Sequence, residues 1–152
     1  MSLRLAILAS LAFATMASPA PVYAINGRHI ARAARTISAT DEAHLRYVRR
    51  AGSRLFEEGT AHGTLPGGVY AECNLGATFV ASVTIHTSSG TIRGHGTAIP
   101  HGSGIYESFS GTLTINGGTG RYVHAHGRAG FYGLFNRRTY ALTVQTTGSL
   151  SY

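Results

Sequence analysis

Two histidines stand two residues apart in GGTGRYVHAHGRAG, residues 117–130. On an extended strand, His124 and His126 would face the same side, about 7 Å apart along the backbone, and two imidazoles at that spacing can bind one metal ion. Zinc and iron sites need three or four ligands, so His95 or His86 would have to supply a third from another strand. We therefore favour a polar strand face, keep the pair only as weak metal candidates, and predict no cofactor.

The same stretch predicts a strand with two unlike faces. If the small, apolar face lines the interior of the fold, the histidines lie outside, for example at a subunit interface. If the polar face points inward, the interior offers hydrogen bonds to a ligand. Alternation alone does not choose between them. The polar face consists of Tyr122, His124, His126 and Arg128, and the small face of Val123, Ala125, Gly127 and Ala129.

Glu107 is the acidic residue with the most informative surroundings, because it shares a strand face with Ile105, Phe109, Leu113 and Ile115. Burial there would raise the pKa of the carboxyl, which could then act as a general acid or base or stabilise a cationic intermediate. The simpler interpretation is a residue near a strand end that reaches water or pairs with an arginine. Glu107 is the candidate catalytic residue. The candidate ligand-binding residues are Glu107, Phe109, Tyr122, His124, His126 and Arg128.

Other reactive side chains have structural interpretations. Cys73 is the only cysteine, alternates with apolar residues, and is expected to be a buried thiol. Glu57 and Glu58 are neighbours that point in opposite directions on a strand, which does not suit a two-carboxylate mechanism. Arg137 and Arg138 lie at a predicted hairpin tip and are interpreted as solvated charges.

Short β-rich runs, separated by glycine, serine, asparagine or proline, are predicted to position these residues. In TFVASVTIHT, residues 78–87, every second residue is apolar, which indicates a half-buried strand. A further strand near residues 44–48 brings the total to about eight, and short connections between consecutive strands are typical of an antiparallel up-and-down β-barrel or a sandwich. The other runs span residues 54–64, 69–75, 91–99, 105–116, 121–135 and 139–152.

Glycines inside the predicted strands favour the barrel. Glycine weakens a strand unless the chain bends sharply or another surface approaches closely, and a small closed barrel needs such bends. The predicted fold is therefore an all-β, eight-stranded antiparallel up-and-down barrel. The glycines concerned are Gly94, Gly96, Gly111, Gly127, Gly130 and Gly133.

The first 24 residues have the pattern of a secretory signal peptide. Arg4 precedes the apolar run Leu5–Ala17, and small residues offer a cleavage site after Ala24. The run is too short to span a bilayer, which needs about 20 apolar residues. We expect a protein secreted to the exterior or periplasm, with no membrane span. The predicted organisation is a signal peptide (1–24), a flexible basic leader (25–40) and a β-barrel domain (41–152).

The net charge of +7 is unevenly distributed. Seven of the 13 arginines lie between residues 25 and 56, alongside two acidic residues, whereas the rest of the chain to its end is nearly neutral. Such an arm can bind anionic surfaces or simply add solubility. Because no recognition motif or aromatic RNA-binding box is present, we predict no nucleic-acid partner.

The hairpin GTLTINGGTGRYVHAHGRAG, with the phenylalanine that follows it, resembles the corresponding hairpin of the allene oxide cyclase/dirigent barrel superfamily over Gly111–Phe131. The resemblance implies an eight-stranded barrel with an apolar lumen that binds or steers small hydrophobic molecules, often as a trimer. It also implies a tight turn at Gly117, Gly118 and Gly120. No catalytic residue carries over by motif, and the chain lacks the cysteine pair often seen in dirigent proteins.

Three functions are compatible with these observations. The first is an exported barrel that binds a small hydrophobic molecule, alone or as a homo-oligomer, without catalysis. The second is a cyclase or isomerase that steers a reactive intermediate, with Glu107 and tyrosines as its reactive groups. The third is a structural surface protein with side chains filling the barrel. The size and polarity of the lumen distinguish the three.

Overall fold

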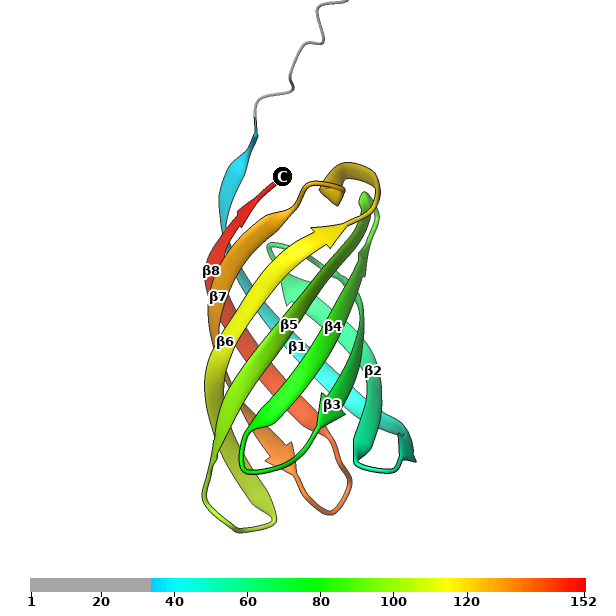
Figure 1. Cartoon of the computed structure of the whole chain (residues 1–152), viewed down its shortest axis with the longest axis vertical. Helices are drawn as coiled ribbons and strands as arrows, with labels where there is room; N and C mark the ends of the chain where they lie inside the picture. Colours follow the sequence, from blue (N-terminus) through cyan, green and yellow to red (C-terminus); the bar gives the residue numbers. More distant parts are fainter. Residues whose placement is uncertain (1–33) are drawn as a thin grey trace, which may run out of the picture. The chain divides into compact units, whose positions relative to one another are not determined.

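Eight antiparallel strands follow one another around a closed barrel in residues 34–152, the part of the chain that the computed structural model describes (Figure 1). Each strand pairs with its neighbours in sequence, and this up-and-down order confirms the predicted fold class. The strands are β1 (Thr36–Ala51), β2 (Arg54–Gly63), β3 (Gly67–Asn74), β4 (Phe79–Thr87), β5 (Gly90–His101), β6 (Tyr106–Gly118), β7 (His126–Asn136) and β8 (Leu142–Ser151).

The barrel closes where β1 pairs with β8. The register runs from Thr36 opposite Ser151 to Leu45 opposite Leu142. Beyond β8, Tyr152 and Arg35 exchange two backbone hydrogen bonds of 2.8 and 2.9 Å. The start of β1 and the end of β8 therefore lie at the same end of the barrel (Figure 1).

The beginning of β1 corrects one predicted boundary. Residues 25–40 were predicted to be a flexible leader, but β1 already begins at Thr36. It pairs with β8 from Thr36 to Leu45 and with β2 from Asp41 onward. The apolar and polar residues of 36–45 alternate across the two faces, which is why this segment joins the sheet. The predicted signal peptide and the first part of the leader lie outside the described residues.

The connection between β6 and β7 corrects a second boundary. We predicted a continuous strand over residues 121–135, but a short 3₁₀-helix, η1 (Gly120–Tyr122), comes first, and β7 begins only at His126. Gly117 and Gly120 have φ of 143° and 60°, in the region that favours glycine, so the chain turns out of the sheet here. No helix within residues 34–152 is long and apolar enough to cross a membrane.

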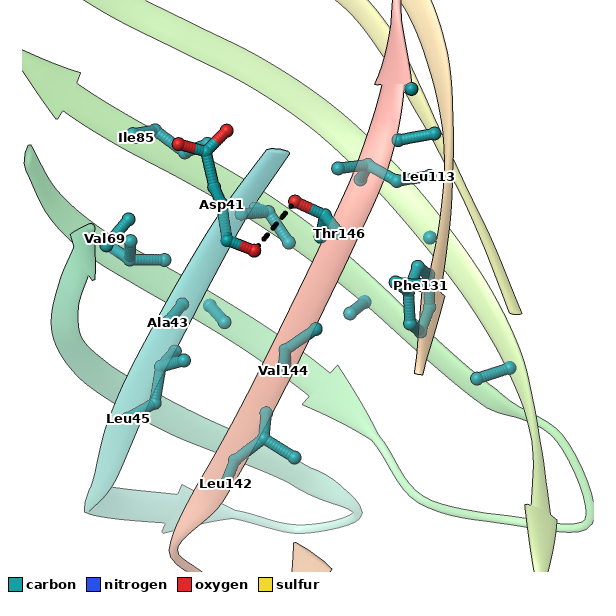
Figure 2. A pocket seen from close by; sticks show the side chains of 18 of the residues that line it. Asp41, Ala43, Leu45, Val69, Ile85, Leu113, Phe131, Leu142, Val144 and Thr146 are labelled. Atoms are coloured by element: carbon teal, nitrogen blue, oxygen red, sulfur yellow. Dashed lines mark hydrogen bonds between the residues drawn. The ribbon is translucent and has the colours of Figure 1, made fainter. Parts of the chain in front are cut away.

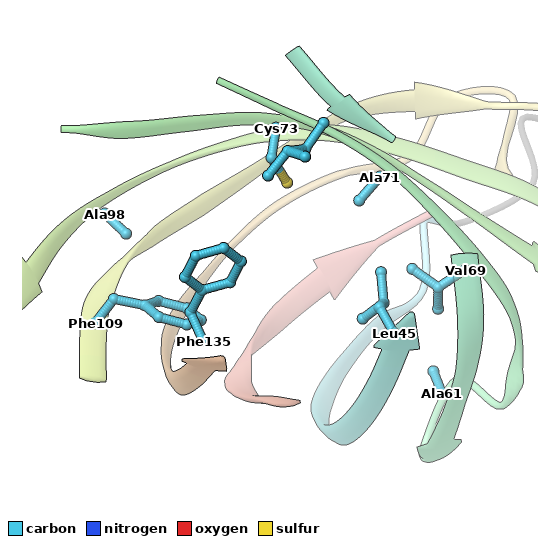
Figure 3. Packing of buried hydrophobic residues seen from close by; sticks show 9 residues of the cluster. Leu45, Ala61, Val69, Ala71, Cys73, Ala98, Phe109 and Phe135 are labelled. Atoms are coloured by element: carbon cyan, nitrogen blue, oxygen red, sulfur yellow. The ribbon is translucent and has the colours of Figure 1, made fainter. Parts of the chain in front are cut away.

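The small, apolar face of β7 points into the barrel. Ala129, Phe131 and Phe135 line the interior, whereas Tyr132 and Leu134 are exposed on the outside. Figure 3 shows apolar side chains from opposite walls pointing into the same interior. The buried cluster consists of Leu45, Leu55, Ala61, Val69, Ala71, Cys73, Ala98, Phe109 and Phe135.

One strand glycine makes room for an aromatic side chain in this core. A Cβ added at Gly133 would lie 2.4 Å from Cζ of Phe109, closer than real Cβ contacts. The missing side chain lets the Phe109 ring lie against the β7 backbone, with ring centroids of Phe79 and Phe131 each 6.1 Å away. At Gly133, therefore, a side chain approaches the strand backbone closely, as expected for a glycine inside a strand.

Candidate functional site

The interior of the barrel contains a cavity of about 160 Å³. Strands from the whole circumference contribute to its wall, and most of the side chains are aliphatic or aromatic. Figure 2 shows Val69, Ile85, Leu113, Phe131 and Val144 around it. The wall is apolar because the inward positions of the strands carry valine, leucine, isoleucine, alanine and phenylalanine, the residues that gain most from leaving water.

Asp41 is one of two carboxyl groups that line this cavity. Its Oδ1 accepts a 2.6 Å hydrogen bond from the backbone N–H of Leu65, and its backbone carbonyl accepts a 3.4 Å bond from the Thr146 hydroxyl (Figure 2). Burial raises the pKa of Asp41, and backbone hydrogen bonds from Leu65 and Thr64 partly offset the rise. Asp41 therefore has a structural role, since it fixes the start of the β2–β3 connection.

Glu57 is the second carboxyl group of the cavity, and it is 1% exposed. It points inward because Leu55, Glu57 and Ala61 occupy alternate positions of β2, while Glu58 points outward and pairs with Arg46 at 2.6 Å. Oε2 of Glu57 accepts a 3.7 Å hydrogen bond from the Cys73 thiol. Oε1 is buried and has no hydrogen-bond partner in residues 34–152.

Desolvation decides the protonation state of this pair. Burial raises the pKa of Glu57 to about 7, and the thiol hydrogen bond offsets only part of the rise. Burial and the nearby Glu57 carboxylate raise the pKa of Cys73 to about 12. The thiol therefore remains protonated and unreactive as a nucleophile, whereas the carboxyl changes charge near neutral pH.

Glu107 lies where the sequence placed it, on an apolar strand face near a strand end. It is 2% exposed, and the Arg137 guanidinium lies 2.7 Å from its carboxylate oxygens. Arg137 was predicted to be a solvated charge. Its side chain is half exposed, but its guanidinium pairs with Glu107, and its backbone N–H donates to the Ile105 carbonyl at 2.8 Å. Glu107 is not among the residues that line the cavity. The pair instead ties the beginning of β6 to the β7–β8 connection.

The other candidate site residues are not brought together. Phe109 lines the cavity, and Arg128 borders it although the residue is exposed on the outside of β7. Tyr122 packs against Tyr152, with ring centroids 5.1 Å apart, in a separate buried cluster. His124 and His126 are exposed outside the lumen.

The histidine pair has a local contact of its own. Nδ1 of His126 lies 3.1 Å from the backbone carbonyl oxygen of His124. Because His124 precedes β7 in a turn, the two side chains are not successive residues on one strand face, as the spacing had suggested. Residues 34–152 contain no group of three histidine, cysteine, aspartate or glutamate side chains placed to hold a metal ion.

Glu57 was not predicted to be a site residue. The signal was present in RLFEEGTA, where Leu55, Glu57 and Ala61 occupy alternate positions, but two adjacent glutamates do not reveal which one points inward. Together the residues form an apolar chamber with two carboxyl groups in its wall, of which Glu57 can donate or accept a hydrogen bond near neutral pH. Known protein families, curated proteins and solved structures were all compared with the chain, and none matches it.

Proposed function

We propose that the protein binds a small hydrophobic molecule inside its barrel. The observation that carries this proposal is the apolar cavity of about 160 Å³. Ligand sites are concave and mostly apolar, with a few polar groups that fix orientation, and an apolar cavity of roughly 150 Å³ can bind a molecule such as benzene. A barrel completely filled by its own side chains, the structural alternative, would not leave this space.

The proposal includes export and membership of the allene oxide cyclase/dirigent barrel type. The apolar run and cleavage pattern of residues 1–24 support export. The Gly111–Phe131 hairpin supports the barrel type, and the eight-stranded antiparallel fold agrees with it. Trimerisation belongs to the same proposal through this resemblance alone.

Binding is tested by titrating the purified protein with isopropylbenzene and following the methyl NMR signals of the lumen residues. We expect saturable shifts at Val69, Leu113 and Val144, which line the cavity. Ala43→Leu adds bulk to the cavity wall and should weaken binding at least tenfold, since close-packed interiors have little spare volume. Ala141→Leu, at an exposed position between β7 and β8, is the matched control. Absence of saturable shifts in the wild-type protein would contradict the proposal.

A second candidate function is a cyclase or isomerase on the same scaffold. Glu57 favours it, because a buried carboxyl with a pKa of about 7 is suited to general acid–base catalysis near neutral pH. Glu107, the residue first considered for this role, is paired with Arg137. Proton transfer to carbon is tested by incubating acetophenone with the protein in D₂O. Deuterium incorporation that Glu57→Gln abolishes would support catalysis, and no incorporation above buffer would contradict it.

A further inference from the structure

We infer that Glu57 recognises the polar end of the lumen's guest, and that this guest is a compact apolar molecule carrying a hydrogen-bond-accepting oxygen, such as a ketone, aldehyde or ether. The inference rests on the proposed binding function and specifies the class of ligand. Glu57 belongs to the wall of the same cavity as the apolar side chains, so one molecule can contact both.

The free oxygen of Glu57 is the observation that points to a ligand. The carboxyl is 1% exposed, and Oε1 has no partner within residues 34–152. A buried polar atom without a partner costs roughly 1–3 kcal/mol, so such atoms are rare unless they have a function. Ala71 lies opposite Glu57 on β3 and is apolar, and Leu55 is the preceding inward residue of β2. Tyr47 lies opposite Glu57 on β1, but it makes no hydrogen bond to Glu57, and no other group of residues 34–152 donates to Oε1. We therefore assign a guest atom as the partner of Oε1.

The contact made by Oε2 indicates which group donates in the hydrogen bond between Glu57 and the guest. Oε2 already accepts from the Cys73 thiol, which stays protonated. When the Glu57 carboxyl is neutral, its proton belongs on Oε1, where it makes a free O–H donor directed at the guest. Because burial keeps the carboxyl neutral up to about pH 7, an acceptor oxygen is the complement of this group under mildly acidic and neutral conditions.

A cationic guest fits this site less well. An ammonium group brings three N–H donors, whereas the Glu57 carboxyl has a single oxygen without a partner among the described residues. Removing both an ammonium and a carboxylate from water costs several kcal/mol for each ion, and only additional hydrogen bonds offset that loss. The apolar wall around Glu57 does not supply them.

Few other charged or titratable groups face Glu57. On β3 it contacts Cys73, and on β1 it lies opposite Tyr47 in the strand register. The remaining charged residues at the cavity wall are Asp41 and Arg128. Changes in ligand affinity around pH 7 are therefore assigned to Glu57, and a variant at this position tests the assignment.

The experiment uses three probes of the same shape: acetophenone, isopropylbenzene and 1-phenylethylamine. Each is titrated against the purified protein by calorimetry at pH 5.5, 7 and 8.5. We expect acetophenone to bind roughly three- to tenfold more tightly than isopropylbenzene at pH 5.5, the range that one net hydrogen bond supplies. This advantage should disappear at pH 8.5, where Glu57 is ionised and has no proton to donate.

Two variants of Glu57 and one variant of its neighbour Glu58 distinguish recognition of the ligand by Glu57 from a purely structural role. Glu57→Gln retains an N–H donor of the same shape and should bind acetophenone with little dependence on pH. Glu57→Leu removes the donor and should bind acetophenone and isopropylbenzene equally. Glu58→Gln changes the adjacent, outward-facing carboxylate that pairs with Arg46, and should behave as the wild type does.

The outcomes distinguish this inference from the proposed function. If none of the probes binds the wild-type protein, the proposed binding function fails. If isopropylbenzene binds but acetophenone gains no advantage at pH 5.5, only the inference is overturned. Tightest binding of 1-phenylethylamine at pH 8.5 would also overturn it, in favour of a cationic guest. The wild-type pH series remains decisive even if a Glu57 variant does not fold.

Discussion

The two buried glutamates of this barrel differ in what surrounds them. Glu107 and Glu57 are 2% and 1% exposed, so their burial is equivalent. The Glu107 carboxylate, at the beginning of β6, contacts Arg137, which follows β7, at 2.7 Å. Glu57 lines the cavity, and among residues 34–152 it has only the thiol of Cys73 as a hydrogen-bond partner, at 3.7 Å.

This difference separates a structural carboxylate from a candidate functional one. Oε2 of Glu107 also has no hydrogen-bond partner within residues 34–152, but it lies 2.7 Å from Nη2 of Arg137, and this positive charge compensates the buried carboxylate. A thiol is a weak donor, and in the described part of the chain it leaves one oxygen of Glu57 without a partner or a nearby positive charge. Burial of an acidic residue is therefore a poor guide to function, and the identity of its partner is a better one.

The largest effect should appear in the pH dependence of stability. Because the native-state pKa of Glu57 is raised from 4.5 to about 7, its stabilising contribution is complete below pH 4.5 and is lost as the pH rises through 7. The free energy of unfolding of the wild type, relative to Glu57→Gln, should fall by about 3 kcal/mol across this window. Urea unfolding at a series of pH values measures it.

Glu58→Gln provides the control and should retain the wild-type decline. A smaller decline that persists in Glu57→Gln belongs to Asp41, whose pKa burial also raises. Identical pH profiles for the wild type and Glu57→Gln would show that Glu57 is not the desolvated group, and the contrast with Glu107 would disappear.

The next effect concerns the partner of Glu107. Arg137→Met removes the guanidinium and leaves a buried carboxylate unpaired, which should lower the free energy of unfolding by about 2 kcal/mol. This cost lies between the cost of breaking a buried ion pair and the cost of breaking an exposed one, because the Arg137 side chain is half exposed. The double variant Glu107→Gln, Arg137→Met should recover at least half of the loss in urea unfolding. No recovery would mean that Arg137 acts through packing alone.

The smallest effect concerns the thiol. Cys73→Ala removes the donor to Oε2 and should raise the pKa of Glu57 further, by less than about one unit, since a thiol hydrogen bond is worth less than about 1 kcal/mol. Titration of the side-chain carboxyl carbon of Glu57 by NMR measures this shift. A lowered pKa in Cys73→Ala would show that the thiol does not stabilise the charged form.

The architecture was predictable from local patterns, because alternation in segments such as residues 78–87 directly reflects an inward and an outward face. The departure of the chain from the sheet at η1 was not predictable. The polar and apolar residues around Tyr122, His124 and His126 continue to alternate there, although the backbone at Gly117 and Gly120 turns the chain out of the sheet. A period of two indicates a strand only where the backbone remains extended.

The site was less predictable than the fold. The environment of Glu107 followed from its own strand, but its pairing with Arg137 depends on which hairpins are adjacent in the barrel. Glu57 obtains its environment from Cys73, 16 positions away on the next strand. Such partners are determined by strand register, which a single sequence specifies only indirectly.

The seam between β1 and β8 has a consequence for biosynthesis. The Thr146 hydroxyl and the Asp41 carbonyl that meet there are 105 positions apart in the chain. While the ribosome is still translating the last strand, β1 lacks one of its two neighbours, and the sheet cannot close. Completion of the barrel must wait until β8 has emerged, and contacts between such distant segments form slowly. Until then the apolar inner wall is open to water, and the nascent chain is at its most vulnerable to aggregation.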